Sequence, residues 1–148
     1  MAKKGTLLII DDEQSVLDSI SSIMEDDVAK ILLASNGREG LEYFENEQID
    51  CVVCDVNMPE LNGVALIKKI RAMKNEVPFI FYTGFASRDL MLEVVKYGAF
   101  DFLEKPDTEH LKEVILKGIS VGANQESENI ESDFISEFKK LMMDLPSK

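Results

Sequence analysis

Several kinds of residue are scarce in this sequence. It has no tryptophan, one histidine and two cysteines among 148 residues. Its first apolar run, Leu7–Ile10, is short and ends in two aspartates. A signal peptide needs a longer run, and a membrane helix needs about 20 apolar residues. We therefore predict a cytoplasmic protein with no membrane partner.

Basic residues are also few, with 16 Lys and Arg against 28 Asp and Glu, for a net charge of −12. Binding to nucleic acid or to anionic lipid requires clustered basic side chains. The charge balance therefore argues against a nucleic-acid partner and favours cations, metals or basic protein patches.

The two cysteines lie in one run, Cys51-Val52-Val53-Cys54. Such a run can be a redox pair, but here it has the composition of a buried strand. Positions three apart on a strand point to opposite faces. We therefore expect two separate, inert core thiols.

Apolar runs alternate with amphipathic stretches five times along the chain. The predicted strands are 6–10, 28–34, 49–54, 78–82 and 100–103. Each is followed by a predicted helix, and Asn36 and Ser87 have the character of helix N-caps, with Glu39 as the capping-box partner of Asn36. Continuous apolar strands indicate a parallel sheet covered on both faces. Five units are too few for a barrel, so we predict an open, doubly wound α/β domain.

The last part of the chain has a different pattern. We place the α/β domain at 1–122, although Gly118 and Gly122 should weaken its final helix. A polar linker follows at 123–129, and an amphipathic C-terminal helix at 130–148. The apolar stripe of that helix consists of Ile130, Phe134, Phe138, Leu141 and Leu145.

Polar side chains follow four of the predicted strands. Asp11, Asp12 and Glu13 follow the first, Asp55 the third, Thr83 and Gly84 the fourth, and Lys105 the fifth. Ligands of open α/β sheets bind at the carboxyl ends of the strands. Any one of these residues alone is more often a helix cap, but together they indicate a site.

Clustered carboxylates repel one another unless a cation is present, and hard oxygen ligands suit Mg²⁺. A lysine and a threonine hydroxyl supply the charge and the donor that a phosphoryl group needs. A carboxylate can attack phosphorus and form an aspartyl phosphate. Asp55 is the best candidate nucleophile because it stands alone after its strand, whereas Asp11 and Asp12 form a metal-binding pair.

The order and spacing of these residues resemble the receiver domain of two-component response regulators. The matching residues, over about 5–122, are Asp11-Asp12, Asp55 with Met58-Pro59 and Gly63, Thr83-Gly84, and Lys105-Pro106. The resemblance implies a flavodoxin-like (βα)5 fold. It also implies that Asp55 accepts a phosphoryl group from a histidine kinase or a histidine phosphotransfer protein.

The resemblance also implies roles for individual residues. Mg²⁺ would bind Asp12 and Asp55 directly, Asp11 through water, and Asn57 through its backbone carbonyl. Thr83, Gly84 and Lys105 would contact the phosphoryl group, and the Lys105–Pro106 peptide would be cis. Thr83 and Phe102 would form the conformational switch, while Asn57 and Phe85 would tune slow self-dephosphorylation.

We expect output by contact with an unidentified downstream protein, since the residues after 123 are too few for a full effector domain. The C-terminal helix can pack on its own domain, pair in a dimer or be released on phosphorylation. A homodimer can also form through the last helices of the domain.

Three other interpretations remain. The chain can be a constitutive, unphosphorylated module or the N-terminal part of a longer regulator. It can also be a phosphatase with an aspartyl nucleophile, although Asn57 cannot protonate a leaving group as a second acid would.

Overall fold

The structure, a computed structural model, describes residues 3–123, 138 and 140–142. A five-stranded, all-parallel sheet has the order β2-β1-β3-β4-β5. The strands are β1 (Thr6–Ile10), β2 (Lys30–Ala34), β3 (Cys51–Cys54), β4 (Phe79–Thr83) and β5 (Asp101–Glu104). The helices are α1 (Gln14–Met24), α2 (Gly37–Asn46), α3 (Gly63–Ala72), α4 (Arg88–Val95) and α5 (Thr108–Ala123). The predicted doubly wound parallel fold is confirmed.

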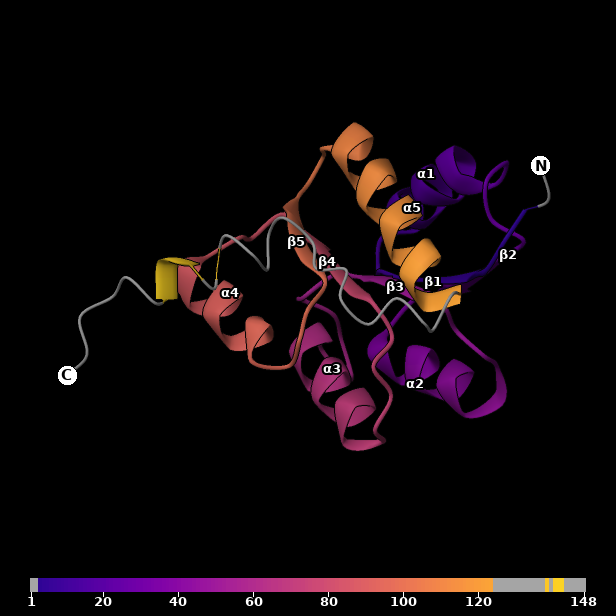
Figure 1. Ribbon diagram of the computed structural model, residues 1–148. Helices are drawn as coiled ribbons and strands as arrows, with labels where there is room; N and C mark the ends of the chain where they lie inside the picture. Colours follow the sequence, from indigo (N-terminus) through magenta and orange to yellow (C-terminus); the bar gives the residue numbers. More distant parts are fainter. Residues whose placement is uncertain (1–2, 124–137, 139, 143–148) are drawn as a thin grey trace.

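Helices cover both faces of the sheet (Figure 1). The buried apolar residues of α1 and α5 form one core cluster, and those of α2, α3 and α4 form the other. Alternate residues of each strand enter opposite clusters, so Cys51 belongs to one and Cys54 to the other. Both thiols are free, and burial raises the pKa of each. The predicted separation of the two cysteines is confirmed.

The structure corrects several local predictions. The second strand begins at Lys30 and the third at Cys51, both later than predicted, while the fifth begins at Asp101 and extends to Glu104. Asn36 caps α2, since its side chain accepts a hydrogen bond from the Glu39 amide at 2.9 Å. The Glu39 carboxylate, however, accepts from the Ser35 hydroxyl at 2.7 Å. In the predicted capping box this carboxylate would accept from the Asn36 amide, so its observed partner lies one residue earlier.

The glycines of α5 do not shorten this helix, which continues to Ala123. A Cβ atom on Gly118 would lie 2.7 Å from Cys51 Sγ, and one on Gly122 would lie 1.7 Å from the Asp50 carbonyl oxygen. These glycines therefore allow α5 to lie directly against the start of β3. The expected weakening therefore does not end the helix, and the close packing gives the glycines their place in it.

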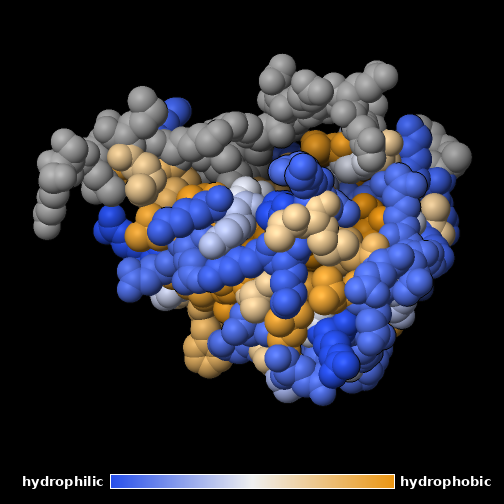
Figure 2. Space-filling view, turned by 90° about the horizontal axis from the view of Figure 1, so that it is seen from below, coloured by the Kyte–Doolittle hydropathy of each residue, from blue (hydrophilic) through white to orange (hydrophobic). Residues whose placement is uncertain are grey.

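Of the predicted C-terminal helix, Phe138, Lys140, Leu141 and Met142 are described, and they are helical. The rest of its apolar stripe, and the predicted linker beyond Ala123, lie outside the described residues. Seen from the side of α2 and α3, the surface shows hydrophilic residues with hydrophobic ones between them toward the middle of the face (Figure 2). Among the described residues, no helix is long and apolar enough to span a bilayer.

Candidate functional site

The parallel sheet positions the predicted site residues through its own backbone hydrogen bonds. Beyond the strand ends, the Asp11 amide donates to the Ala34 carbonyl at 3.1 Å, and the Asp55 amide donates to the Ile10 carbonyl at 3.0 Å. The Lys105 amide donates to the Thr83 carbonyl at 2.9 Å. Because β1 lies beside β3 and β4 beside β5, these bonds hold the acids and the lysine at one edge of the sheet.

The Lys105 ammonium is the centre of this cluster. Its Nζ lies 2.8 Å from Asp11 Oδ2, 3.3 Å from Asp55 Oδ2 and 3.5 Å from Glu13 Oε1. Asp11 and Asp55 are only 2% and 7% exposed. One lysine therefore neutralises part of the charge of two buried carboxylates and one exposed carboxylate.

The backbone holds the second oxygen of each buried carboxylate. Asp55 Oδ1 accepts from the Val56 amide at 2.7 Å, and Asp11 Oδ1 accepts from the Glu13 amide at 2.9 Å. Each carboxylate is thus oriented with its Oδ2 atom toward Lys105. Charge-assisted bonds of this kind favour the ionised form.

The pKa values of Asp11 and Lys105 are both raised, but for different reasons. Burial raises the pKa of Asp11, although the hydrogen bonds from Lys105 and Glu13 oppose this shift. Burial lowers the pKa of Lys105, but its hydrogen bond to Asp11 and the charges of Asp11 and Asp55 outweigh burial, so its pKa is raised. Lys105 therefore stays charged at neutral pH.

The carboxylate oxygens fit a divalent cation. One oxygen each from Asp11, Asp12, Glu13 and Asp55 lies within 4.8 Å of the others. Asp12 and Glu13 are exposed, and Asn57 is exposed on the loop after Asp55. Hard oxygen donors with access to water suit Mg²⁺, which keeps several of its waters. Glu13 was not among the predicted ligands, although it directly follows the predicted pair.

The end of β4 supplies the predicted hydroxyl. Thr83 is fully buried, and its Oγ1 accepts a hydrogen bond from the Phe85 amide at 3.3 Å. A Cβ atom on Gly84 would meet nothing within 4 Å, so the space beside Gly84 is open. Phe85 is 72% exposed. Phe102 is 7% exposed, with its ring 5.9 Å from that of Phe81.

Two backbone features shape the walls of the site. The Gly63 amide donates to the Val56 carbonyl at 2.9 Å, which closes the loop behind Asp55. A Cβ atom on Gly63 would lie 2.4 Å from the Asp55 carbonyl oxygen, so only glycine fits there without a shift. On the other side, the Lys105–Pro106 peptide is cis.

A doubly wound parallel sheet with acids after β1 and β3, a hydroxyl at the end of β4 and a lysine after β5 defines a receiver-type α/β domain. The family model of the response regulator receiver domain matches residues 7–116. The chain belongs to this family.

Known relatives and solved structures agree with this assignment. The chain is 34% identical over 106 residues to the transcriptional regulatory protein FixJ of Bradyrhizobium diazoefficiens, a match that covers 72% of this chain and 52% of FixJ. It is 31% identical over 115 residues to the transcriptional regulatory protein ZraR of Escherichia coli K12, covering 77% of this chain and 26% of ZraR. The match therefore spans about half or less of these two relatives.

A CheY-like response regulator receiver domain protein from Methanospirillum hungatei JF-1 has the same fold. It superimposes with a TM-score of 0.76 at 27% identity, and the match covers 84% of this chain and 99% of that protein. The fold similarity thus extends over nearly all of a solved receiver domain.

Proposed function

We propose that this chain is a phosphorylation-activated switch in which Asp55 accepts a phosphoryl group from a histidine kinase or a histidine phosphotransfer protein. The observation that carries the proposal is the orientation of the Asp55 carboxylate. Its Oδ1 is held by the Val56 amide, while its Oδ2 faces Lys105 beside Asp11 at the open end of the sheet. Receiver domains of this family act as signalling switches, which gives the arrangement its context.

In the proposed reaction, a lone pair of Asp55 Oδ2 forms the new P–O bond. The P–N bond of the donor phosphohistidine breaks, and its electron pair stays on the imidazole nitrogen, which takes up a proton. Lys105 leaves its carboxylate partners and contacts a phosphoryl oxygen, as do the Thr83 hydroxyl and the Gly84 amide. The acyl phosphate that results is the active state.

The acidic residues of the site would bind the metal ion. Asp11, Asp12 and Asp55, together with the Asn57 backbone carbonyl, would hold Mg²⁺. The ion supplies positive charge where negative charge builds up during in-line transfer. Without it, a donor phosphate would face four carboxylates and a single lysine, so transfer should require the metal.

The conformational switch would use the hydroxyl of Thr83. This hydroxyl accepts from the Phe85 amide in the present arrangement, and it would turn toward the phosphoryl group on Asp55. The loop that begins at Gly84 would move with it, and phosphorylation would shift the population of two states. Phe102, the other residue of the proposed switch, is buried beside Phe81.

The test is intact-protein mass spectrometry after incubation with a small acyl-phosphate donor. We expect one added phosphoryl group with Mg²⁺, none with a chelator and none in Asp55→Asn. A matched control, Asp26→Asn, removes an exposed carboxylate from the turn after α1 and should be phosphorylated like the wild type. An adduct that persists in Asp55→Asn would refute Asp55 as acceptor.

No adduct in a correctly folded wild type would favour the constitutive interaction module instead. Steady release of phosphate from a phosphomonoester would favour the phosphatase. We do not favour the phosphatase because Asn57, two residues after Asp55, offers no acid for the leaving group.

The proposed output is contact with another protein. FixJ and ZraR are named transcriptional regulatory proteins, but the match covers only 52% and 26% of their lengths. We therefore propose no nucleic-acid contact for this chain, whose net charge of −12 opposes one. A cytoplasmic location is part of the same proposal.

A further inference from the structure

Helix α4 is thinly packed against the rest of the domain. Val94 is its only buried residue. Leu90 and Met91 lie against the core that contains Val94. Leu92 and Val95 are also partly buried, yet they belong to neither core cluster. We define Leu92 and Val95 as the outer face of α4.

Phe138 has the complementary property. It is 9% exposed, yet it too belongs to neither core cluster. Residues 138, 141 and 142 share one face of a helix, but Leu141 is 64% and Met142 is 47% exposed. Along this face the Phe138 side chain is therefore buried, while the side chains of the next turn are exposed.

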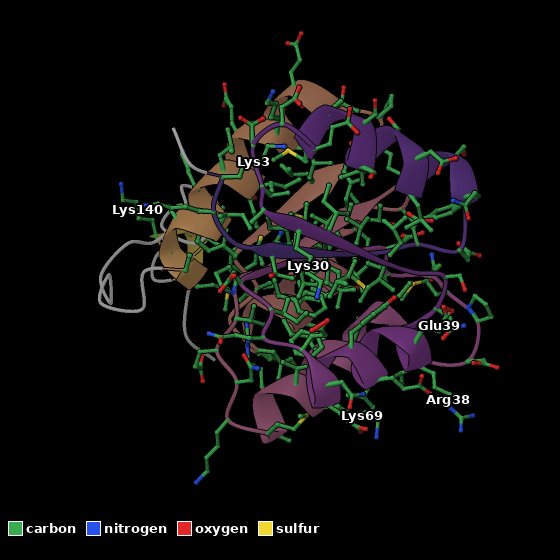
Figure 3. The ribbon with its side chains drawn as sticks, turned by 90° about the vertical axis from the view of Figure 1, so that its right-hand side faces the viewer. Lys3, Lys30, Arg38, Glu39, Lys69 and Lys140 are labelled. Carbon is green, nitrogen blue, oxygen red and sulfur yellow. The ribbon has the colours of Figure 1, made fainter. Side chains whose placement is uncertain are left out.

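The position of the C-terminal segment connects these observations. The short helical stretch that carries residues 140–142, drawn in yellow, lies at α4 on the side away from the sheet (Figure 1). Lys140 points away from the body of the domain (Figure 3), as its exposed side chain requires. The segment thus turns Phe138 inward and Lys140 outward.

We propose that the helical stretch that carries Phe138 and residues 140–142, the C-terminal segment, binds the outer face of α4 of its own chain through Phe138. This intramolecular cover hides Leu92 and Val95, so another protein gains access to them only when the segment leaves. The loop before α4, residues 84–87, directly follows Thr83. The cover therefore sits on the helix next to the candidate site.

Hydrogen–deuterium exchange on the full-length chain, without a phosphoryl donor, tests the proposal. In Phe138→Ala we expect the amides of α4 to exchange at least threefold faster, while those of α3 are unchanged. The matched control is Leu141→Ala, which truncates an exposed residue on the same face of the same segment and should leave α4 exchange within experimental error. Equal effects of both variants, or no effect of Phe138→Ala, would overturn the proposal.

A variant on the α4 side of the contact distinguishes loss of this contact from a general loss of stability. Leu92→Ala should speed exchange in the peptide that contains residues 138–142, because it removes the other side of the contact. Faster exchange confined to α4 itself would contradict the cover.

The dependence of exchange on protein concentration tests whether the segment that covers α4 comes from the same chain or from a second copy. If the cover is intramolecular, exchange in α4 is the same over a hundredfold range of protein concentration, and sedimentation shows a monomer wherever protection is present. Protection that appears only where sedimentation shows a dimer would assign the segment to a second copy and would overturn the intramolecular cover. Neither result depends on Asp55 being phosphorylated, so failure here would leave the proposed function untouched.

Discussion

At the scale of single residues, Lys105 stabilises the site through its charge. Its pKa is raised above 10.5 in the folded chain despite burial. A raised lysine pKa contributes stability that is fully present below the unfolded value and is lost as pH rises through the folded value. We predict that Lys105→Met lowers the free energy of unfolding near neutral pH, and that the difference from wild type shrinks above about pH 10.5.

Denaturant unfolding from pH 7 to 12, without metal, measures this difference. Lys69→Met is the matched control, since Lys69 points from α3 into solvent (Figure 3). Its difference from wild type should be small and independent of pH. A Lys105→Met difference that stayed constant to pH 12 would mean that the ion pairs do not stabilise the fold.

Phe85 is the second residue whose effect we predict. Its exposed ring stands two positions after Thr83 and offers no hydrogen bond to a water that attacks the acyl phosphate. Phe85→Ala should open the approach of this water and speed loss of the phosphoryl group several-fold. The decay of the phosphorylated mass after donor removal measures it, and an unchanged or longer lifetime would refute this role.

At the scale of elements, one arginine ties α3 to the turn after α4. Arg71 Nε donates to the Tyr97 carbonyl at 2.7 Å, Nη1 to the Asn75 carbonyl at 2.8 Å and Nη2 to the Gly98 carbonyl at 3.2 Å. Lys68 adds an ion pair to Glu93 at 3.3 Å. Because α4 buries only Val94, these polar bonds hold the C-terminal end of α4 in place. The N-terminal end of α4 comes directly after the loop that begins at Gly84.

We therefore predict that Arg71→Met destabilises the fold by about 2 kcal/mol, since hydrogen bonds from a charged donor contribute about 1.5–3 kcal/mol. Chemical denaturation measures this loss, and Lys69→Met should stay within about 0.5 kcal/mol of wild type. Hydrogen exchange at Tyr97 and Gly98 should rise in Arg71→Met. Equal stability of the two variants would show that these bonds do not anchor α4.

At the scale of the whole molecule, charge is the dominant feature. A net charge of −12 opposes the compact state, so salt should stabilise the fold by screening. A divalent ion that binds only the folded chain stabilises further, by about 1.4 kcal/mol at ten times its dissociation constant. We predict that Mg²⁺ raises the melting temperature more than NaCl at equal ionic strength.

This excess should vanish in Asp12→Asn and persist in Asp26→Asn, which changes the net charge equally. Thermal unfolding of the wild type and the two variants, with Mg²⁺ or with NaCl at equal ionic strength, measures this excess. If Mg²⁺ and Na⁺ act alike on the wild type at equal ionic strength, the acidic cluster is not a magnesium site.

Much of the fold and of the candidate site is predictable from local pattern. Apolar runs predict the strands because a parallel strand is buried on both faces, and the N-cap at Asn36 is predictable because its side chain bonds its own helix. Asp11, Asp55 and Lys105 are predictable from their positions directly after strands, because parallel strands all end at the same edge of the sheet. The Cys51 and Cys54 thiols diverge because the strand repeat is two residues.

The sequence by itself determined the alternation of strands and helices, the faces of the sheet and the residues at its edge, because these depend on neighbours along the chain. Only the tertiary structure decided which of those residues meet. It placed Glu13 beside Lys105 and laid Gly118 against Cys51. It also buried Phe138 while leaving Leu141 exposed, although both belong to one apolar stripe. These contacts and this difference in burial depend on packing, and packing is a property of the whole folded chain.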